Sequence, residues 1–426
     1  MARLGPPHAY PLPWWLQQTF RRWIDNFDAG LFDSKEAALA SNALYRYWNM
    51  VGVKDAHQES LVGQAGEIEP VYERYAVTCF VVEAGRLHLP QWLDPGSGGP
   101  ALAQHRQDGY LPVLFTTYRP TAGIEVEQRT LATTVGVRQR AMVLSRLVVR
   151  ATGAGPQRGE LGIGVIPVKP SGFVRHDRAG RYLADSTLSF LRYLPAERRL
   201  ETNTFTGPVF DTAPATFGLY GNPNSSWDPD RYLAENPFAA LASGGALNGA
   251  ETASDSVAGM CTAAFTWPFE LAAGQELAVD LRLPIDDFRG AGDFAELAAP
   301  AAGDLEAGNL GFWRPKLTGS GLQAQLPPVV AHLADLFRSC RADLLILADD
   351  GAIHPGPTIY DSFWIRDSSV EAIACALAGD TGLAATQLGQ HHLSAFNTGF
   401  ERIGPVSAHG FFGMEHERND NEWDSN

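Results

Sequence analysis

The feature that most constrains this fold is a change of hydrophobic period near residue 320. Before it, runs such as 124–132 and 143–151 alternate apolar and polar residues, the pattern of strands with one buried face. After it, apolar residues recur every three or four positions, the pattern of amphipathic helices. The sequence therefore predicts a β part followed by an α part.

The β part contains many short segments rich in β-branched and aromatic residues, separated by Gly and Pro. They are 71–83, 124–132, 143–151, 161–168, 186–192, 259–269 and 276–283. Consecutive strands without intervening helices predict two packed antiparallel sheets. We expect an amphipathic helix over 14–27 to pack on this sandwich, 203–255 to form a long loop, and 290–308 to form a partly helical linker.

Three helices are predicted in the α part. The first follows Pro328 and is expected to end at Gly351. The second begins at Asp367 or Ser368, where a capping-box pattern spans 368–371. The third covers about 382–396.

Length and composition set further limits. The 426 residues suggest two domains, which we place at 1–320 and 321–426. The net charge of -15 disfavours nucleic acid as a partner, because that binding requires cations that neutralise phosphates. No apolar run has the length of a signal peptide core or a membrane span, so we expect a cytoplasmic protein without membrane contact.

The four cysteines are widely separated and form no Cys-x-x-Cys pair. They are Cys79, Cys261, Cys340 and Cys375. This spacing predicts neither a disulfide framework nor a zinc site, and we expect buried free thiols.

One motif precedes the second predicted helix: Tyr360-Asp-Ser-Phe-Trp364-Ile-Arg366-Asp367. An indole can stack on the apolar face of a sugar, a guanidinium donates to hydroxyls, and a carboxylate accepts from them. The competing interpretation is that Asp367 is a helix N-cap with Arg366 as its ion-pair neighbour.

A second motif lies at the end of the chain, where Glu422, Trp423 and Asp424 follow one another. A carboxylic acid beside an indole can have a raised pKa and act as a proton donor. The competing interpretation is a solvated acidic tail. The spacing of His416 to these carboxylates does not support a metal site, and we expect no metal or cofactor.

These two motifs, together with the β-then-α order, resemble the six-hairpin glycosidases. That clan includes glucoamylase-type and trehalase-type hydrolases and related glycosyl phosphorylases. The resemblance implies an antiparallel β-supersandwich followed by the first helices of an (α/α)6 barrel. It also implies that Trp364, Arg366 and Asp367 bind a sugar on the non-reducing side of the cleaved bond, with Tyr360 and Trp423 also contacting substrate.

The resemblance further implies that Asp424 is the general acid of an inverting glycoside hydrolase, with Glu422 as the alternative acid. The substrate is then an oligosaccharide or another glycoside. Two other functions stay open. One is a phosphorylase of the same clan, in which phosphate replaces the attacking water. The other is a non-catalytic carbohydrate-binding sandwich.

The number of helices limits this interpretation. Twelve helices with their connections need at least about 200 residues, whereas 100 residues follow position 326. We therefore expect an incomplete barrel, with the catalytic base beyond residue 426. We also expect a chain that is inactive alone and self-associates through exposed helical faces.

Overall fold

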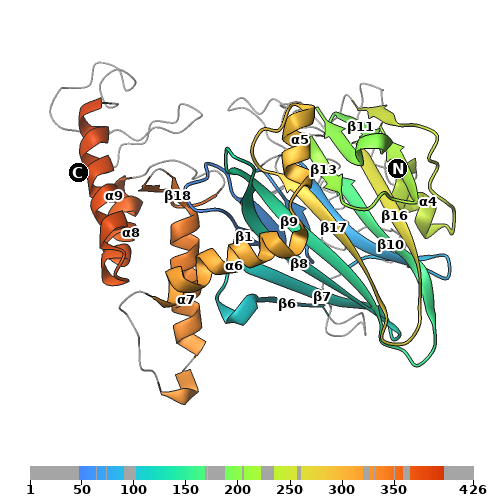
Figure 1. The fold of residues 1–426 in the computed structure, drawn as a ribbon, viewed down its shortest axis with the longest axis horizontal. Helices are drawn as coiled ribbons and strands as arrows, with labels where there is room; N and C mark the ends of the chain where they lie inside the picture. Colours follow the sequence, from blue (N-terminus) through green and yellow to red (C-terminus); the bar gives the residue numbers. More distant parts are fainter. Residues whose placement is uncertain are drawn as a thin grey trace, which may run out of the picture.

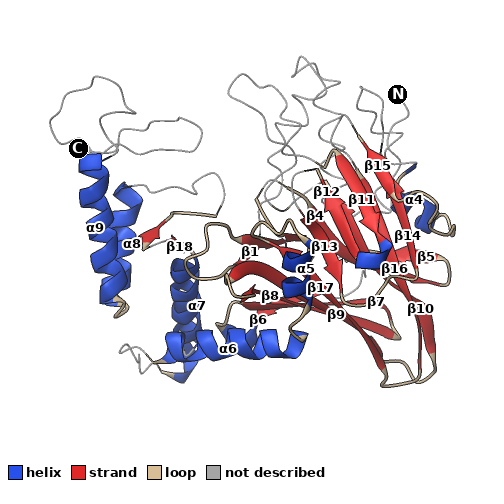
Figure 2. Cartoon of the chain, turned by 45° about the horizontal axis from the view of Figure 1, so that its top comes forward, coloured by secondary structure: helices blue, strands red, loops and turns tan. Residues whose placement is uncertain are grey.

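The computed structural model shows a β part followed by helices, as the sequence predicts (Figure 1). The structure describes residues 48–63, 65–72, 74–90, 102–167, 170, 188–203, 206–221, 235–256, 261–319, 327–330, 332–349, 351–357 and 365–397. The helix expected over 14–27 lies outside them. Figure 2 shows the strands of the two large sheets on one side of the molecule, and α7, α8 and α9 with β18 on the other.

The first sheet of the sandwich has eight antiparallel strands in the described part of the chain. In pairing order they are β1 (Trp48–Val51), β2 (Ser60–Gly63), β3 (Ile68–Glu69), β4 (Ala76–Glu83), β10 (Gln157–Ile166), β16 (Thr262–Leu271) and β14 (Thr216–Tyr220), with β5 (Arg86–His88) paired to β4. The crossover from β4 to β10 means that segments far apart in sequence complete this sheet.

The second sheet has nine strands among the described residues. In pairing order they are β15 (Ala253–Asp255), β11 (Phe190–Leu194), β12 (Arg199–Thr202), β13 (Thr206–Phe210), β17 (Glu276–Pro284), β9 (Arg140–Ala151), β8 (Ile124–Val135), β7 (Val113–Thr121) and β6 (Leu102–Arg106). Short 3-10 helices are η2 (Gln107–Gly109), η4 (Pro195–Glu197) and η5 (Pro328–Val330).

The main core lies between the inner faces of the two sheets. Alternation works as predicted on β8, where Ile124 and Val126 are buried in this core while Glu125 and Glu127 lie on the other face. The strands predicted from the sequence are confirmed. The expected long loop over 203–255 is wrong, because its described parts include β13, β14, β15 and helix α4 (Pro237–Ala242).

The linker over 290–308, expected to be partly helical, is mostly helical. Its helices α5 (Ala291–Ala298) and α6 (Ala302–Thr318) cover a second apolar cluster on the outer face of the nine-stranded sheet. The buried guanidinium of Arg282 on β17 holds this layer, because it donates to Asp211 and to the carbonyl oxygens of Leu297 and Pro300. The Asn309 amide donates to the Ala132 carbonyl at 2.6 Å. Packing against the sheet therefore makes helices of a segment rich in Ala and Gly.

The α part contains α7 (His332–Ile346), a hairpin of β18 (Ala348–Asp349) and β19 (Ala352–Ile353), α8 (Ile365–Leu377) and α9 (Thr381–Asn397). The expectation that Gly351 ends the first helix is wrong. Gly351 forms the hairpin turn at φ 85°, and a Cβ there would lie 2.3 Å from the Thr386 side chain. The third predicted helix is confirmed as α9.

The second predicted helix exists, but it begins before the expected cap. α8 starts at Ile365, so Asp367 lies in its first turn and not at its N-cap. Ser368 is fully buried and its hydroxyl donates to the Ile353 carbonyl at 3.4 Å, so the predicted capping box is wrong.

Apolar and ionic contacts join the sandwich to α7. A buried cluster contains Met50 of β1, Trp313 of α6 and Ile346 of α7. Arg106 of β6 donates to both carboxylate oxygens of Asp343, at 2.8 and 3.0 Å. These contacts bring the β18–β19 hairpin to the edge of the sandwich, where the Asp55 amide donates to the Ala348 carbonyl at 3.1 Å.

All four cysteines are free, as predicted. Cys79, Cys261 and Cys375 are buried, but Cys340 is exposed, so the expectation of burial is wrong for that thiol. In the described ranges, no helix is both long and apolar enough to cross a membrane.

Candidate functional site

The candidate site lies where the first turn of α8 meets the β18–β19 hairpin. Asp367 is half-buried there. Arg366 belongs to the same turn of α8. The other predicted site residues, Tyr360, Trp364, Glu422, Trp423 and Asp424, lie outside the described residues. Asp367 is therefore the one predicted carboxylate that lies within the described residues. The structure shows which side chains surround it.

Hydrogen bonds to Ile353 fix the hairpin between α8 and α9. The Ile353 amide donates to the side-chain oxygen of Gln387 at 2.7 Å, and the Gln387 amide donates to the Ile353 carbonyl at 3.3 Å. Gln387 is fully buried. Because both helices hold the backbone of Ile353, the next residue, His354, is held in place beside α8.

His354 forms a polar cluster with groups from three segments. Its Nδ1 lies 3.6 Å from Oδ2 of Asp349, a residue only 5% exposed. Nδ1 of His57, from the loop after β1, lies 3.9 Å from the same oxygen. One buried carboxylate thus lies between an imidazole of the sandwich and an imidazole of the α part.

Glu371 completes this group from the next turn of α8. Burial raises the pKa of its carboxyl to about 7, and repulsion from Asp367 adds to the rise, while His354 opposes it. Positions 367 and 371 are four residues apart, so both carboxyls lie on one face of the helix. A carboxylic acid that holds its proton near neutral pH beside a second carboxyl is an arrangement common in acid–base sites.

A cavity of about 680 Å³ adjoins the cluster on the sandwich side. The loop containing His57, the ends of β8 and β9, and α6 line it. Phe312, about half exposed, and Asn309 come from α6. Its volume falls in the range of small-molecule sites, and His57 connects it to Asp349.

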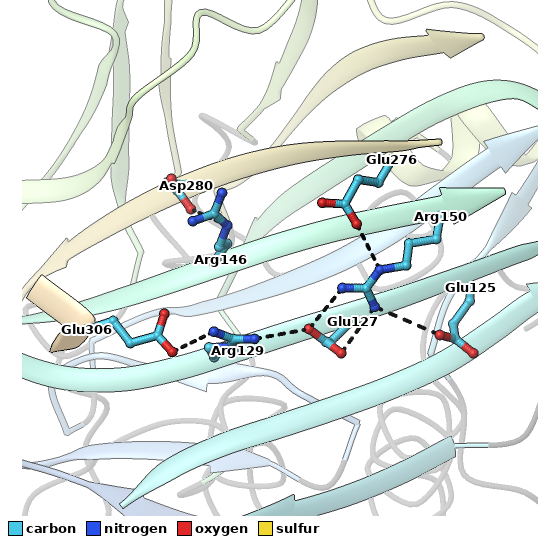
Figure 3. Close-up of polar contacts among 8 residues, drawn as sticks. All are labelled: Glu125, Glu127, Arg129, Arg146, Arg150, Glu276, Asp280 and Glu306. Atoms are coloured by element: carbon cyan, nitrogen blue, oxygen red, sulfur yellow. Dashed lines mark hydrogen bonds and ion pairs between the residues drawn. The ribbon is translucent and has the colours of Figure 1, made fainter. Parts of the chain in front are cut away.

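Another polar network lies on the outer face of the nine-stranded sheet and consists of paired arginine and acidic side chains (Figure 3). Arg129 pairs with Glu306 at 2.5 Å, and Arg150 pairs with Glu127 at 3.2 Å and with Glu276 at 3.0 Å. Since carboxylates already neutralise these guanidinium groups, we interpret the network as structural support for the sheet. It gives no support to a sugar site on this face.

The sequence motif led to Asp367 but not to its partners. Glu371 was interpreted as part of a capping box, whereas it faces His354. Its spacing of four residues from Asp367 was the one available signal. No sequence signal pointed to Asp349 and His57, because only the tertiary fold brings these two residues together. Among the described residues, no group of three or more His, Cys, Asp or Glu side chains has the geometry to hold a metal ion.

No family model and no curated protein sequence matches this chain. Among solved structures, an inverting mannosidase of family GH92 from Bacteroides thetaiotaomicron matches with a TM-score of 0.37 and 10% identity, over 71% of this chain and 35% of that one. A candidate kojibiose phosphorylase from the human microbiome matches with a TM-score of 0.42 and 8% identity, over 82% and 42%. The chain thus spans less than half the length of either structure.

Proposed function

We propose that this chain is part of a carbohydrate-active enzyme, and that it contributes a sugar-binding subsite at the start of α8. Trp364, Arg366 and Asp367 bind the sugar in this proposal, with Tyr360 beside them. The position of Asp367 carries it, because this carboxyl lies beside a polar cluster at the junction of sandwich and helices. An ionised carboxylate accepts hydrogen bonds from hydroxyl groups such as those of a sugar.

The reaction that we propose is inverting hydrolysis of a glycosidic bond. Asp424 acts as the proton donor, with Glu422 as the alternative and Trp423 as its apolar neighbour. A general acid must hold its proton at the working pH, and an apolar surrounding achieves this by disfavouring the carboxylate. The domain division at 1–320 and 321–426 belongs to the same proposal.

The first experiment measures binding of neutral sugars to the chain by isothermal titration calorimetry. Glucose, mannose and trehalose are the probes. We expect Asp367→Asn to weaken binding by about tenfold, because a charged acceptor contributes about 1.5–3 kcal/mol against about 1 kcal/mol for a neutral one. Asp255→Asn, at an exposed position of β15 in the sandwich, is the matched control. Equal affinity of Asp367→Asn and the original chain would refute the subsite.

The second experiment distinguishes hydrolysis from phosphorolysis and from simple binding. Products of α-glucosides and trehalose are analysed with and without inorganic phosphate. A sugar phosphate formed only with phosphate supports the phosphorylase alternative. Sugar binding that survives Asp367→Asn unchanged supports the non-catalytic sandwich.

A further inference from the structure

Glu371 is a partly buried carboxyl of the α part that its surroundings satisfy incompletely. Its Oε2 atom is buried and accepts no hydrogen bond from any group in the described part of the chain. The groups that face it are Asp367, four residues earlier on α8, and His354 beside the hairpin. In an ionised carboxylate, this Oε2 atom would lose water without gaining a hydrogen-bond donor.

The charged groups on the neighbouring elements offset the charge of Glu371 only in part, through His354, because most of them already face other carboxylates. Arg341 of α7 is held by both carboxylate oxygens of Asp380, at 2.5 and 2.7 Å. His354 lies close to Asp349, which also has His57 within 3.9 Å. One turn further along α8, burial raises the pKa of Cys375 to about 11, with smaller contributions from Asp380 and Glu371, so this thiol is neutral.

We propose that Glu371 is a positioning residue: its carboxyl, with Oε2 buried, lies one turn from Asp367 on the same face of α8, and in its neutral form it leaves the Asp367 carboxylate to accept from a sugar hydroxyl. This inference rests on the proposed function. Ionisation of Glu371 places a second negative charge one turn from Asp367 in a partly buried setting. The two carboxylates then separate or draw in water, and either change weakens the contact with a neutral ligand.

The expected pH dependence follows from the direction of the shift. The pKa of Glu371 is raised, so the proton is bound below about pH 7 and lost above it. Sugar affinity is therefore highest below this value and declines above it, by up to about tenfold per pH unit when the ionised form does not bind. Glu371→Gln keeps the size of the side chain and a neutral head group at every pH.

The test measures glucose and mannose affinity by calorimetry from pH 5.5 to 8.5. We expect the affinity of the original chain to fall about tenfold between pH 6 and pH 8. Glu371→Gln should stay constant within about twofold. The matched control is Glu251→Gln, which changes an exposed glutamate of the sandwich and should follow the original chain. A flat profile for the original chain, or a falling one for Glu371→Gln, overturns the inference.

A ligand-free measurement checks the proton itself. The side-chain carboxyl carbons of glutamate are labelled with ¹³C, and the Glu371 signal is assigned from its loss in Glu371→Gln. A midpoint near 7 supports the inference, and one below about 5, near the ordinary glutamate value, overturns it. Failure to bind either sugar at any pH would refute the proposed function as well, whereas binding with an unchanged pH profile would refute the positioning role alone.

Discussion

Replacement of Arg341 by methionine should loosen the packing of α7 against the rest of the α part. Arg341 and Asp380 are only 5% and 10% exposed and form a bidentate pair with distances of 2.5 and 2.7 Å. Arg341→Met keeps an apolar stem of similar length but leaves the buried carboxylate unpaired. Removal of one partner from such a pair typically destabilises by about 3–5 kcal/mol.

The position of Asp380 favours the lower end of that range. Asp380 directly precedes α9, and its carbonyl accepts from the Ala384 amide at 3.0 Å. An unpaired carboxylate there still interacts favourably with the N-terminus of the helix, by about 0.3–1 kcal/mol. We therefore expect a loss of about 3 kcal/mol in the free energy of local opening.

Hydrogen exchange measured by mass spectrometry reports this local stability without assuming that the whole chain unfolds in one step. A loss of about 3 kcal/mol corresponds to roughly 150-fold faster exchange of protected amides in α8 and α9. Arg338→Met is the control on the same helix, because its pair with Asp335 at 2.9 Å is 35% and 41% exposed and its loss should change exchange by only about twofold. Exchange in Arg341→Met within fivefold of this control would refute the reasoning.

Three further outcomes are expected. Gly162→Ala should destabilise the sandwich by about 1–3 kcal/mol in thermal unfolding, because its Cβ would lie 2.0 Å from the fully buried Phe80 ring, and an unchanged melting temperature would contradict this. A thiol reagent should label exposed Cys340 in the folded chain but not buried Cys79, whose pKa burial raises to about 12, and mass spectrometry of the labelled peptides checks it. Ile373→Glu should reduce self-association in concentration-dependent sedimentation, because this α8 side chain is 60% exposed, and a monomeric original chain would remove the basis for this.

Local sequence rules predicted the elements whose packing follows from one repeating pattern. The alternation at Ile124 and Val126 placed β8 correctly, because a strand with one buried face must repeat every two residues. The same rules indicated only a partly helical linker over 290–308 and did not extend α6 to Thr318, because Gly308, Gly311 and Pro315 are poor helix formers. The sheet surface beneath α6 supplies the apolar contacts that its own sequence does not indicate.

In the candidate site, too, local sequence patterns predicted some features and packing between elements decided the others. The motif drew attention to Asp367, since an indole, a guanidinium and a carboxylate in succession are typical of hydroxyl recognition. Gly351 was misassigned as a helix end because the sequence alone cannot distinguish a left-handed helix cap from a hairpin turn.

The sequence by itself determined the order of a β-sandwich and then helices, because hydrophobic period is a property of neighbouring residues along the chain. It also identified Asp367 as a candidate ligand contact. Only the tertiary structure decided that Asp349 lies between His57 and His354, with Glu371 of α8 near His354. The reason is physical: burial, which raises the pKa of Glu371, depends on packing between elements, and the contact of His57 with Asp349 joins segments about 290 residues apart in sequence.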